Sequence, residues 1–299
     1  MKAAYMLSLW FRYFPYVGLN EFLFDRICKR YINRRNFIVP TTTLQGAKFS
    51  CRLGDTIQRN IFYFGVWEPH ITAYILSNID ENDLFVDVGS NIGYYTVITG
   101  KRCGKVVSIE ASPKIYAELK NNLALNDLAN VRAVNIAVGE KRDEVSIYSG
   151  PASNIGATTT LKDRTNGRKA LTFETKIPSL PIGQILTDVE KKEARFIKID
   201  IEGAEYPVLK NIFEHVSHYR VDVEIVVEFS PEDCRKFGGS PQEFIAMAEE
   251  AGFFVYQIRN KYKTFDYTNR VEFERPHRIK ALPGEQVDLV LSRRNTTVL

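Results

Sequence analysis

Asp87 stands where a carboxylate can meet a bound ligand. It follows the short apolar run 84–86, which is typical of the end of a buried parallel strand, and it precedes Gly89 and Gly93 in the pattern D-x-G-x-x-x-G. Gly89 lets the backbone bend sharply and approach a ligand closely, and Gly93 lets a helix over 94–99 begin near the strand. The free amides at the start of such a helix favour polar or anionic groups.

The pattern differs from the dinucleotide fingerprint G-x-G-x-x-G, because the middle glycine that admits a pyrophosphate is missing. A carboxylate at position 87 repels a pyrophosphate but suits a cationic ligand. The ammonium and sulfonium groups of S-adenosylmethionine (SAM) meet that description. Gly89, Ser90, Asn91 and Gly93 then form the expected cofactor loop. The simpler alternative is a strand-turn-helix corner in which Asp87 only caps the helix.

A second apolar strand, 106–109, ends in Glu110, about twenty residues after Gly89. At that spacing an acidic residue meets both ribose hydroxyls of a bound nucleoside, and a carboxylate accepts both of them. Ala111 follows directly and is expected beside the same ligand. The alternative is a helix N-terminal acid ahead of Pro113, which suits the helix dipole but does not explain the spacing.

Four segments, VDVGSNIGYYT, SIEASP, NIAVG and KIDIEGAEYPVLK, resemble the FkbM-type SAM-dependent methyltransferases over residues 65–229. The run IDIEGAE at 199–205 is the most specific of these signals. The resemblance implies a class I methyltransferase fold and methyl transfer to oxygen, usually a hydroxyl of a sugar or a small natural product. Family members often carry a G-x-W/Y-E-P stretch ahead of the first motif, here 65–69. Glu68 is therefore a candidate contact to the amino-acid end of SAM or to the acceptor, or else an N-cap.

Asp200 and Glu202 follow the fourth core strand, the usual place for acceptor-side residues in this fold. Methyl transfer to oxygen needs a base for the hydroxyl proton, so Asp200 or Glu202 is the predicted base, with Glu205 a lesser candidate. Asp200 is also counted among the cofactor contacts. In a competing hypothesis Asp200, Glu202 and Glu228 hold a divalent metal, although the spacing does not require one. In a third, Glu202 and Glu205 only cap the following helix.

The alternation of strand-like and helix-like runs predicts a Rossmann-like, mostly parallel sheet with helices on both faces. Seven strands are expected, ending near 88, 110, 138, 199, 228, 258 and 291, and residues 37–61 are expected to form strands and turns. Ligands of such sheets bind at the carboxyl ends of the strands. Asn135 and Ala137 fall there, where an adenine ring would be met, and Asn135 is either a partner of the adenine amino group or an ordinary polar residue.

The segment 150–168 contains Pro151 and is rich in glycine, asparagine and threonine, which is typical of a substrate lid or of a plain solvated excursion. Lys162, Arg164 and Arg168 give it a positive charge that would help an anionic acceptor.

Residues 1–40 form a predicted helical extension ahead of a methyltransferase domain at 41–299. The extension holds seven basic residues against two acidic ones, a net charge of +5, and many aromatic residues. It would either pack on the body or on a second subunit, which is favoured, or rest on an anionic membrane. It lacks the small-residue cleavage site of a secretory signal.

The remaining 259 residues sum to a charge of −1, which disfavours a nucleic-acid substrate. Four scattered cysteines without a C-x-x-C pair argue against zinc and for reduced thiols, so a cytoplasmic protein is expected, with peripheral membrane contact as an option. The leading hypothesis is a SAM-dependent O-methyltransferase. The rivals are a catalytically silent scaffold, docked to a membrane or partner through residues 1–40, and a nicotinamide-dependent oxidoreductase, which the missing glycine disfavours.

Overall fold

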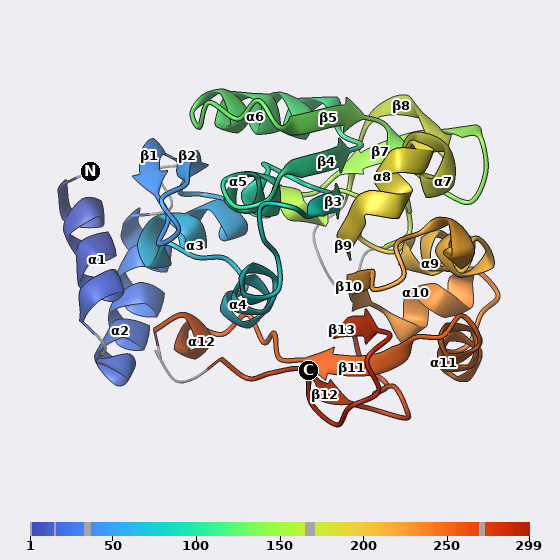
Figure 1. The fold of residues 1–299 in the computed structure, drawn as a ribbon. Helices are drawn as coiled ribbons and strands as arrows, with labels where there is room; N and C mark the ends of the chain where they lie inside the picture. The colour runs from blue at the N-terminus through green and yellow to red at the C-terminus, as the bar shows by residue number, and fades with distance from the viewer. Residues whose placement is uncertain (1, 15, 33–36, 165–170, 269–272) are drawn as a thin grey trace.

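The centre of the molecule is an eight-stranded mixed sheet (Figure 1). The computed structural model describes residues 2–14, 16–32, 37–164, 171–268 and 273–299. The strands of the sheet are β3 (Leu84–Val88), β4 (Lys105–Glu110), β5 (Val131–Asn135), β9 (Ala194–Ile199), β10 (Glu224–Phe229), β11 (Phe254–Ile258), β12 (His277–Arg278) and β13 (Val287–Ser292). Their order across the sheet is β12-β11-β13-β10-β9-β3-β4-β5.

The five central strands β10, β9, β3, β4 and β5 run parallel, and β13 enters antiparallel to β10. The chain builds outward from β3 to β5, then crosses back to place β9 on the other side of β3. The strand order therefore reverses between β3 and β9. The expected Rossmann-like fold is confirmed, but the sheet has eight strands rather than seven. The additional strand, β12, is only two residues long and so leaves no periodic pattern in the sequence.

Alternate side chains of each strand enter two separate cores, as the period of two in a strand requires. Phe85 packs with the helices α3 (Thr56–Phe64), α4 (Pro69–Ser77), α5 (Tyr94–Gly100) and α6 (Pro113–Ala124). Val86 packs with α7 (Ile182–Ile185), α9 (Glu205–Glu214), α10 (Pro231–Lys236) and α11 (Pro241–Glu250). Helix α8 (Asp188–Glu193) leads into β9. The predicted helices on both faces are thus present.

Two small sheets flank the main one: β1 (Ile38–Thr42) with β2 (Lys48–Arg52), and β6 (Ala137–Val138), β8 (Thr172–Leu180) and β7 (Asp143–Ser149) in that order. The expected strand over 131–138 is divided between β5 and β6, which belong to different sheets. Asn135 marks the division, because its side-chain amide donates to the backbone oxygens of Glu110 and Ala111 at the end of β4.

Residues 37–61 are not only strands and turns, because α3 begins at Thr56. This helix is rich in β-branched and aromatic residues, a composition that is typical of strands. Its ends nevertheless follow helix rules: Asp55 accepts a bond from the N–H of Gln58, and Gly65 closes the helix with a left-handed φ of 73°.

The N-terminal extension consists of α1 (Lys2–Tyr13), α2 (Val17–Leu23) and a π-helix, η1 (Phe24–Ile32). Phe11 and Phe24 point inward against Tyr63 and Phe64 of α3, with ring centroids 4.7–6.0 Å apart. Helix α12 (Thr264–Thr268) lies beside α2 (Figure 1). Arg34 and Arg35 of the basic cluster lie outside the described residues.

Within the described ranges, no helix combines the length and the apolar character needed to cross a bilayer. The four cysteines, Cys28, Cys51, Cys103 and Cys234, are buried free thiols, as the sequence predicts.

Candidate active site

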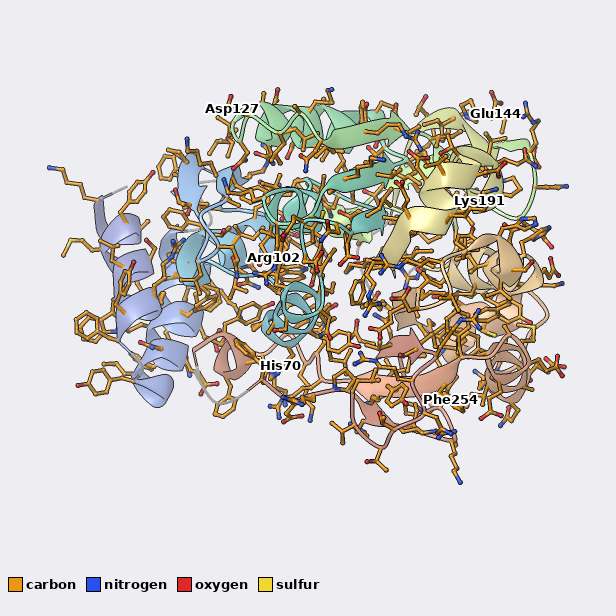
Figure 2. All side chains as sticks on the ribbon, viewed as in Figure 1. His70, Arg102, Asp127, Glu144, Lys191 and Phe254 are labelled. Carbon is orange, nitrogen blue, oxygen red and sulfur yellow. The ribbon has the colours of Figure 1, made fainter. Side chains whose placement is uncertain are left out.

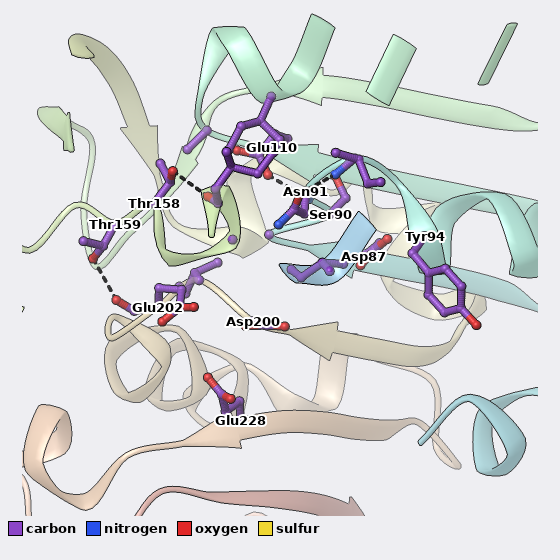
Figure 3. Close-up of a pocket in the computed structure, with 18 of the residues that line it drawn as sticks. Asp87, Ser90, Asn91, Tyr94, Glu110, Thr158, Thr159, Asp200, Glu202 and Glu228 are labelled. Carbon is purple, nitrogen blue, oxygen red and sulfur yellow. Dashed lines mark hydrogen bonds between the residues drawn. The ribbon is translucent and has the colours of Figure 1, made fainter. Parts of the chain in front are cut away.

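A cavity of about 360 Å³ lies at the carboxyl ends of the parallel strands, where the strand order reverses. Figure 3 shows two sets of polar side chains on its wall. The β3–β4 half contains Asp87, Gly89, Ser90, Asn91, Glu110 and Ala111, and the β9–β10 half contains Lys198, Asp200, Glu202 and Glu228 together with Tyr262. Ala137 and residues 154–156 and 158–160 of the predicted lid segment complete the wall.

Asp87 caps α5 and also lines the cavity. Its Oδ2 accepts bonds from the backbone N–H of Thr96 at 2.9 Å and from the Thr96 hydroxyl at 2.6 Å. Asp87 therefore does cap the helix, as the simpler alternative predicts. It also lines the cavity. Burial raises the pKa of Asp87 to about 6.

Glu110 is held by backbone amides. Its Oε2 accepts from the N–H of Asn91 and its Oε1 from the N–H of Ser112, each at 2.8 Å. Asn91 has a left-handed φ of 52°, and this backbone conformation directs its main-chain N–H toward the Glu110 carboxylate. Since a carboxylate oxygen has two lone pairs, both oxygens retain an acceptor site. Burial raises the pKa of Glu110 to about 7.

The two halves meet at Gly89. Its φ is 81°, and a Cβ there would overlap the backbone oxygen of Asp200. Glycine is therefore required for the close approach of the ends of β3 and β9. Gly93, with φ 86°, makes room for the side chain of Leu119 in α6 and does not line the cavity.

Three predicted site residues lie behind the wall. Asn135 donates its amide hydrogens to the end of β4, as described above. Glu205 accepts N–H bonds from Ile201 and Gly203 and so closes the turn ahead of α9. Glu68 is buried with φ 44°. Its carboxylate accepts from the hydroxyls of Tyr95 and Tyr262, at 2.7 and 2.8 Å, and from the Asn260 amide at 3.0 Å.

Lys198 and Asp200 form an ion pair on the wall. The ammonium of Lys198 lies 2.8 Å from Oδ2 of Asp200, 3.8 Å from Glu68, and 4.8 Å from the ring centre of Tyr95. Burial lowers the pKa of Lys198, but the carboxylates of Asp200 and Glu68 outweigh burial and raise it above its ordinary value. The lysine therefore keeps its charge and is the counter-ion of Asp200.

Arg164 of the lid segment is buried between two carboxylates. Its guanidinium pairs with Glu202 and with Asp233, the latter at 3.0 Å. The Thr159 hydroxyl donates to the backbone oxygen of Glu202 at 2.7 Å. Burial lowers the pKa of Arg164, but Glu202 and the neighbouring acids raise it overall. The predicted positive charge of this residue thus fastens the lid segment to the turn after β9, whereas Arg168 lies outside the described residues.

Glu228 shares a phenol with Glu68. The Tyr262 oxygen lies 2.8 Å from Oε1 of Glu68 and 3.1 Å from Oε1 of Glu228. A phenol has one proton, so both contacts are hydrogen bonds only when one carboxyl group is protonated. Burial, followed by the carboxylates of Asp200 and Glu202, raises the pKa of Glu228 well above its ordinary range. A proton on Glu228 would let Glu228 donate to the phenol oxygen while the phenol donates to Glu68.

Comparison with known proteins places this site in a family. The methyltransferase FkbM domain matches residues 87–255, more than half of the chain. The chain belongs to the FkbM methyltransferase family. The resemblance found in the four sequence motifs is thereby confirmed.

Two sequence relatives have methyltransferase in their names. Methyltransferase sdnD of Sordaria araneosa is 25% identical over 232 residues, which cover 68% of this chain and 85% of that protein. The hexuronic acid methyltransferase AglP of Haloferax volcanii is 28% identical over 170 residues, 56% of this chain and 66% of that protein. A crystal structure of methyltransferase FkbM from Methylobacillus flagellatus is 16% identical with a TM-score of 0.45. The match covers 78% of this chain and only half of that structure's chain.

Within this FkbM family member, Lys198 and Tyr262 are wall residues that the sequence reasoning missed. Lys198 leaves a usable signal, because a lysine inside an apolar strand is rare without a buried partner. Tyr262 leaves none. It lies in a connection after β11, with a left-handed φ of 50°, and stacks on Trp67 at 5.3 Å.

The histidines do not enter the wall of the cavity. His70, labelled in Figure 2, lies at the start of α4, where its Nδ1 accepts from the N–H of Glu274 at 3.1 Å. His215 and His218 lie past α9 and are exposed.

The carboxylates of Asp200, Glu202 and Glu228 offer ligand atoms within 4.8 Å of one another. Oxygen ligands of this kind suit a hard divalent cation. Lys198 and Arg164, however, already pair with the first two carboxylates. Protein cations thus supply the positive charge that a metal would otherwise bring.

Proposed function

We propose that this FkbM family member is a SAM-dependent O-methyltransferase that acts on a hydroxyl of a sugar, a glycan or a small natural product. One observation carries the proposal: a single cavity holds an amide-bound carboxylate, Glu110, and across from it a lysine-paired carboxylate, Asp200. The name of the Haloferax volcanii relative, a hexuronic acid methyltransferase, supports a sugar-like acceptor.

The β3–β4 half fits SAM by the chemistry of its donors and acceptors. Glu110 has one acceptor site left on each oxygen, which suits the two ribose hydroxyls. Asp87 contributes negative charge for the cationic amino-acid and sulfonium groups, and the small side chains of Ala111 and Ala137 leave room for the adenine ring. When bound, the cofactor supplies a methyl group made electrophilic by its positive sulfur.

The β9–β10 half supplies the base. A hydroxyl becomes a good nucleophile when a base accepts its proton as the new bond forms. Asp200 meets this need, because it lines the cavity and the ammonium of Lys198 holds its carboxylate in place at 2.8 Å. Glu228 keeps its proton toward the phenol oxygen of Tyr262 and so positions that side chain, instead of acting as a second base. A charged and a neutral carboxyl group side by side thus have different roles, Asp200 as the base and Glu228 as a positioning group.

The experiment combines binding and turnover on the purified chain. Calorimetric titration with SAM and S-adenosylhomocysteine tests the cofactor, with and without Mg²⁺. Release of S-adenosylhomocysteine is then measured over a panel of free sugars, uronic acids and nucleotide sugars. We expect micromolar binding and an O-methylated product. Binding without turnover on any hydroxylated acceptor would favour the silent scaffold, and a product methylated on nitrogen would refute the O-methyltransferase.

A further inference from the structure

The N-terminal extension has a second apolar face, turned away from the body of the protein. Its exposed large apolar side chains are Tyr5, Met6, Leu9, Tyr13, Phe14, Tyr16, Leu19 and Phe22. These are eight of the nineteen exposed large apolar side chains in the described part of the chain, gathered in about a tenth of its length. A helix that is apolar on both sides is expected to be covered on both sides. Tyr5 lies at the edge of this set, because its hydroxyl donates to the backbone oxygen of Pro40 at 3.2 Å and its ring contacts Phe62 of α3. We call this set of eight the outer face.

The outer face is free of charge because Arg12 turns inward. Arg12 is the one charged residue between Lys2 and Glu21. Its guanidinium donates to Thr41 Oγ1 at 2.9 Å and to backbone oxygens of β1 and α3, among them that of Ile61 at 3.2 Å. Gly65 leaves space for it, since a Cβ there would lie 3.2 Å from the guanidinium carbon.

The turn between α1 and α2 satisfies its own polar groups. The N–H groups of Phe14, Tyr16 and Asn20 donate to backbone oxygens within the same turn at 2.8–3.0 Å. The Asn20 amide donates to the backbone oxygen of Phe14 at 2.8 Å and accepts from the Trp10 indole at 2.9 Å. A segment that enters a medium poor in water needs such internal hydrogen bonds.

Basic side chains border the outer face. Lys2 begins α1, which contains no acidic residue, and Arg26, Lys29 and Arg30 are exposed on η1. The acids of the same stretch are Glu21 and Asp25, and Asp25 pairs with Lys29 at 2.7 Å. Aromatic and aliphatic side chains flanked by lysine and arginine are typical of segments that lie in the interface of an anionic bilayer.

We propose that the outer face of residues 2–32 rests on an anionic lipid surface, with its aromatic and aliphatic side chains in the headgroup region. Contact between two copies through the same patch would bring the two basic η1 helices toward each other. Lipid phosphates instead attract them. The contact is peripheral, and the opposite face of the extension stays packed on α3.

Vesicle sedimentation with the full chain tests this proposal. The vesicles are phosphatidylcholine alone, or equal parts of phosphatidylcholine and phosphatidylglycerol. We expect binding to the mixed vesicles that weakens as salt rises. The double variant Leu9→Glu/Phe22→Glu should lose about tenfold or more of this binding, because it removes apolar contacts and adds negative charge. Arg26→Gln should lose about fivefold on the mixed vesicles only.

Val189→Glu/Phe173→Glu is the matched control. Its side chains are 58% and 56% exposed, against 57% for both Leu9 and Phe22, but they lie outside the extension. This control should bind vesicles like the wild type, and S-adenosylhomocysteine binding and thermal unfolding verify that all variants fold. Equal vesicle binding by the two double variants would overturn the proposal. So would the absence of binding to mixed vesicles, whether or not light scattering reveals a dimer that Leu9→Glu/Phe22→Glu dissociates.

Discussion

The two halves of the cavity are held together in different ways. The β3–β4 half comes from one stretch, residues 87–111, and its carboxylates are fixed by backbone N–H groups and by Thr96. The β9–β10 half collects Asp200, Glu228 and Tyr262 from three separate segments. An ion pair and the two contacts of the Tyr262 phenol hold that half in place.

This difference separates binding from proton transfer. Backbone amides set the position of Glu110, which suits recognition of hydroxyl groups that do not react. In the other half, Lys198 pairs with Asp200, and burial together with the neighbouring carboxylates raises the pKa of Glu228, an arrangement that suits proton transfer. Variants that damage one half should therefore leave the function of the other half intact.

The largest effect is expected from Asp200→Asn, which removes the proposed base and keeps the shape of its side chain. Turnover should fall about 10²–10⁴-fold, since the amide does not accept the hydroxyl proton. Affinity for S-adenosylhomocysteine, measured by calorimetry, should stay at the wild-type level because the β3–β4 half is untouched.

Glu202→Gln is the comparison variant for the base, because Glu202 is the other predicted candidate and pairs with Arg164. It should reduce turnover far less than Asp200→Asn. A larger loss of turnover for Glu202→Gln would identify Glu202 as the base. A loss of cofactor affinity in Asp200→Asn would show that Asp200 contacts the cofactor.

Glu110→Ala is the reciprocal experiment, and the expected loss is about 100-fold in SAM affinity, the equivalent of two charge-assisted hydrogen bonds partly lost. In the wild type, affinity should rise as pH rises through about 7, the raised pKa of Glu110, because the ionised form is the better acceptor. Calorimetry over a pH series measures both effects. The exposed Glu140→Ala serves as the control, and unchanged affinity in Glu110→Ala would refute the ribose assignment.

Much of the fold was predictable because its signals are local. Each core strand is a short apolar run, and glycines with left-handed backbone mark the turn after β3. Helix α3 was missed because its β-branched and aromatic residues imitate a strand, while its caps at Asp55 and Gly65 lie outside the run. The division of β5 from β6 depends on Asn135 reaching across to β4, a contact that no local pattern encodes.

In the site, too, residues set by local sequence were predictable, and residues set by long-range contacts were not. The spacing of Asp87 and Glu110 predicted two residues of the wall, since both belong to one strand-helix-strand unit. The role of Tyr262 could not be predicted from the sequence, because it lies 34 residues from Glu228 and 194 from Glu68 along the chain. For Asn135 and Glu68 the sequence left a ligand contact and a structural role open, and in the structure the surrounding backbone and side chains engage their polar groups.

The pH dependence of turnover provides a smaller effect that sharpens the comparison. Glu228 carries a raised pKa, so its active protonated form is lost as pH rises through that value. Turnover at saturating SAM should then fall by up to about tenfold per pH unit on the alkaline side. Glu228→Gln keeps a hydrogen-bond donor that does not titrate, so the turnover of this variant should no longer fall at alkaline pH. A metal ligand at this position predicts instead that Glu228→Gln inactivates the enzyme and that chelators do the same.

The smallest effect is expected from Tyr262→Phe, which keeps the ring on Trp67 and removes the bridge between Glu68 and Glu228. The free energy of unfolding should fall by about 1 kcal/mol, the net value of a typical hydrogen bond, and the acceptor KM should rise while SAM affinity stays constant. Tyr219→Phe is the matched control, because the buried Tyr219 hydroxyl has no hydrogen-bond partner among the described residues. Its removal should leave stability unchanged or increased. Equal stability losses in both variants, measured by thermal unfolding, would show that the phenol bridge does not hold the β9–β10 half.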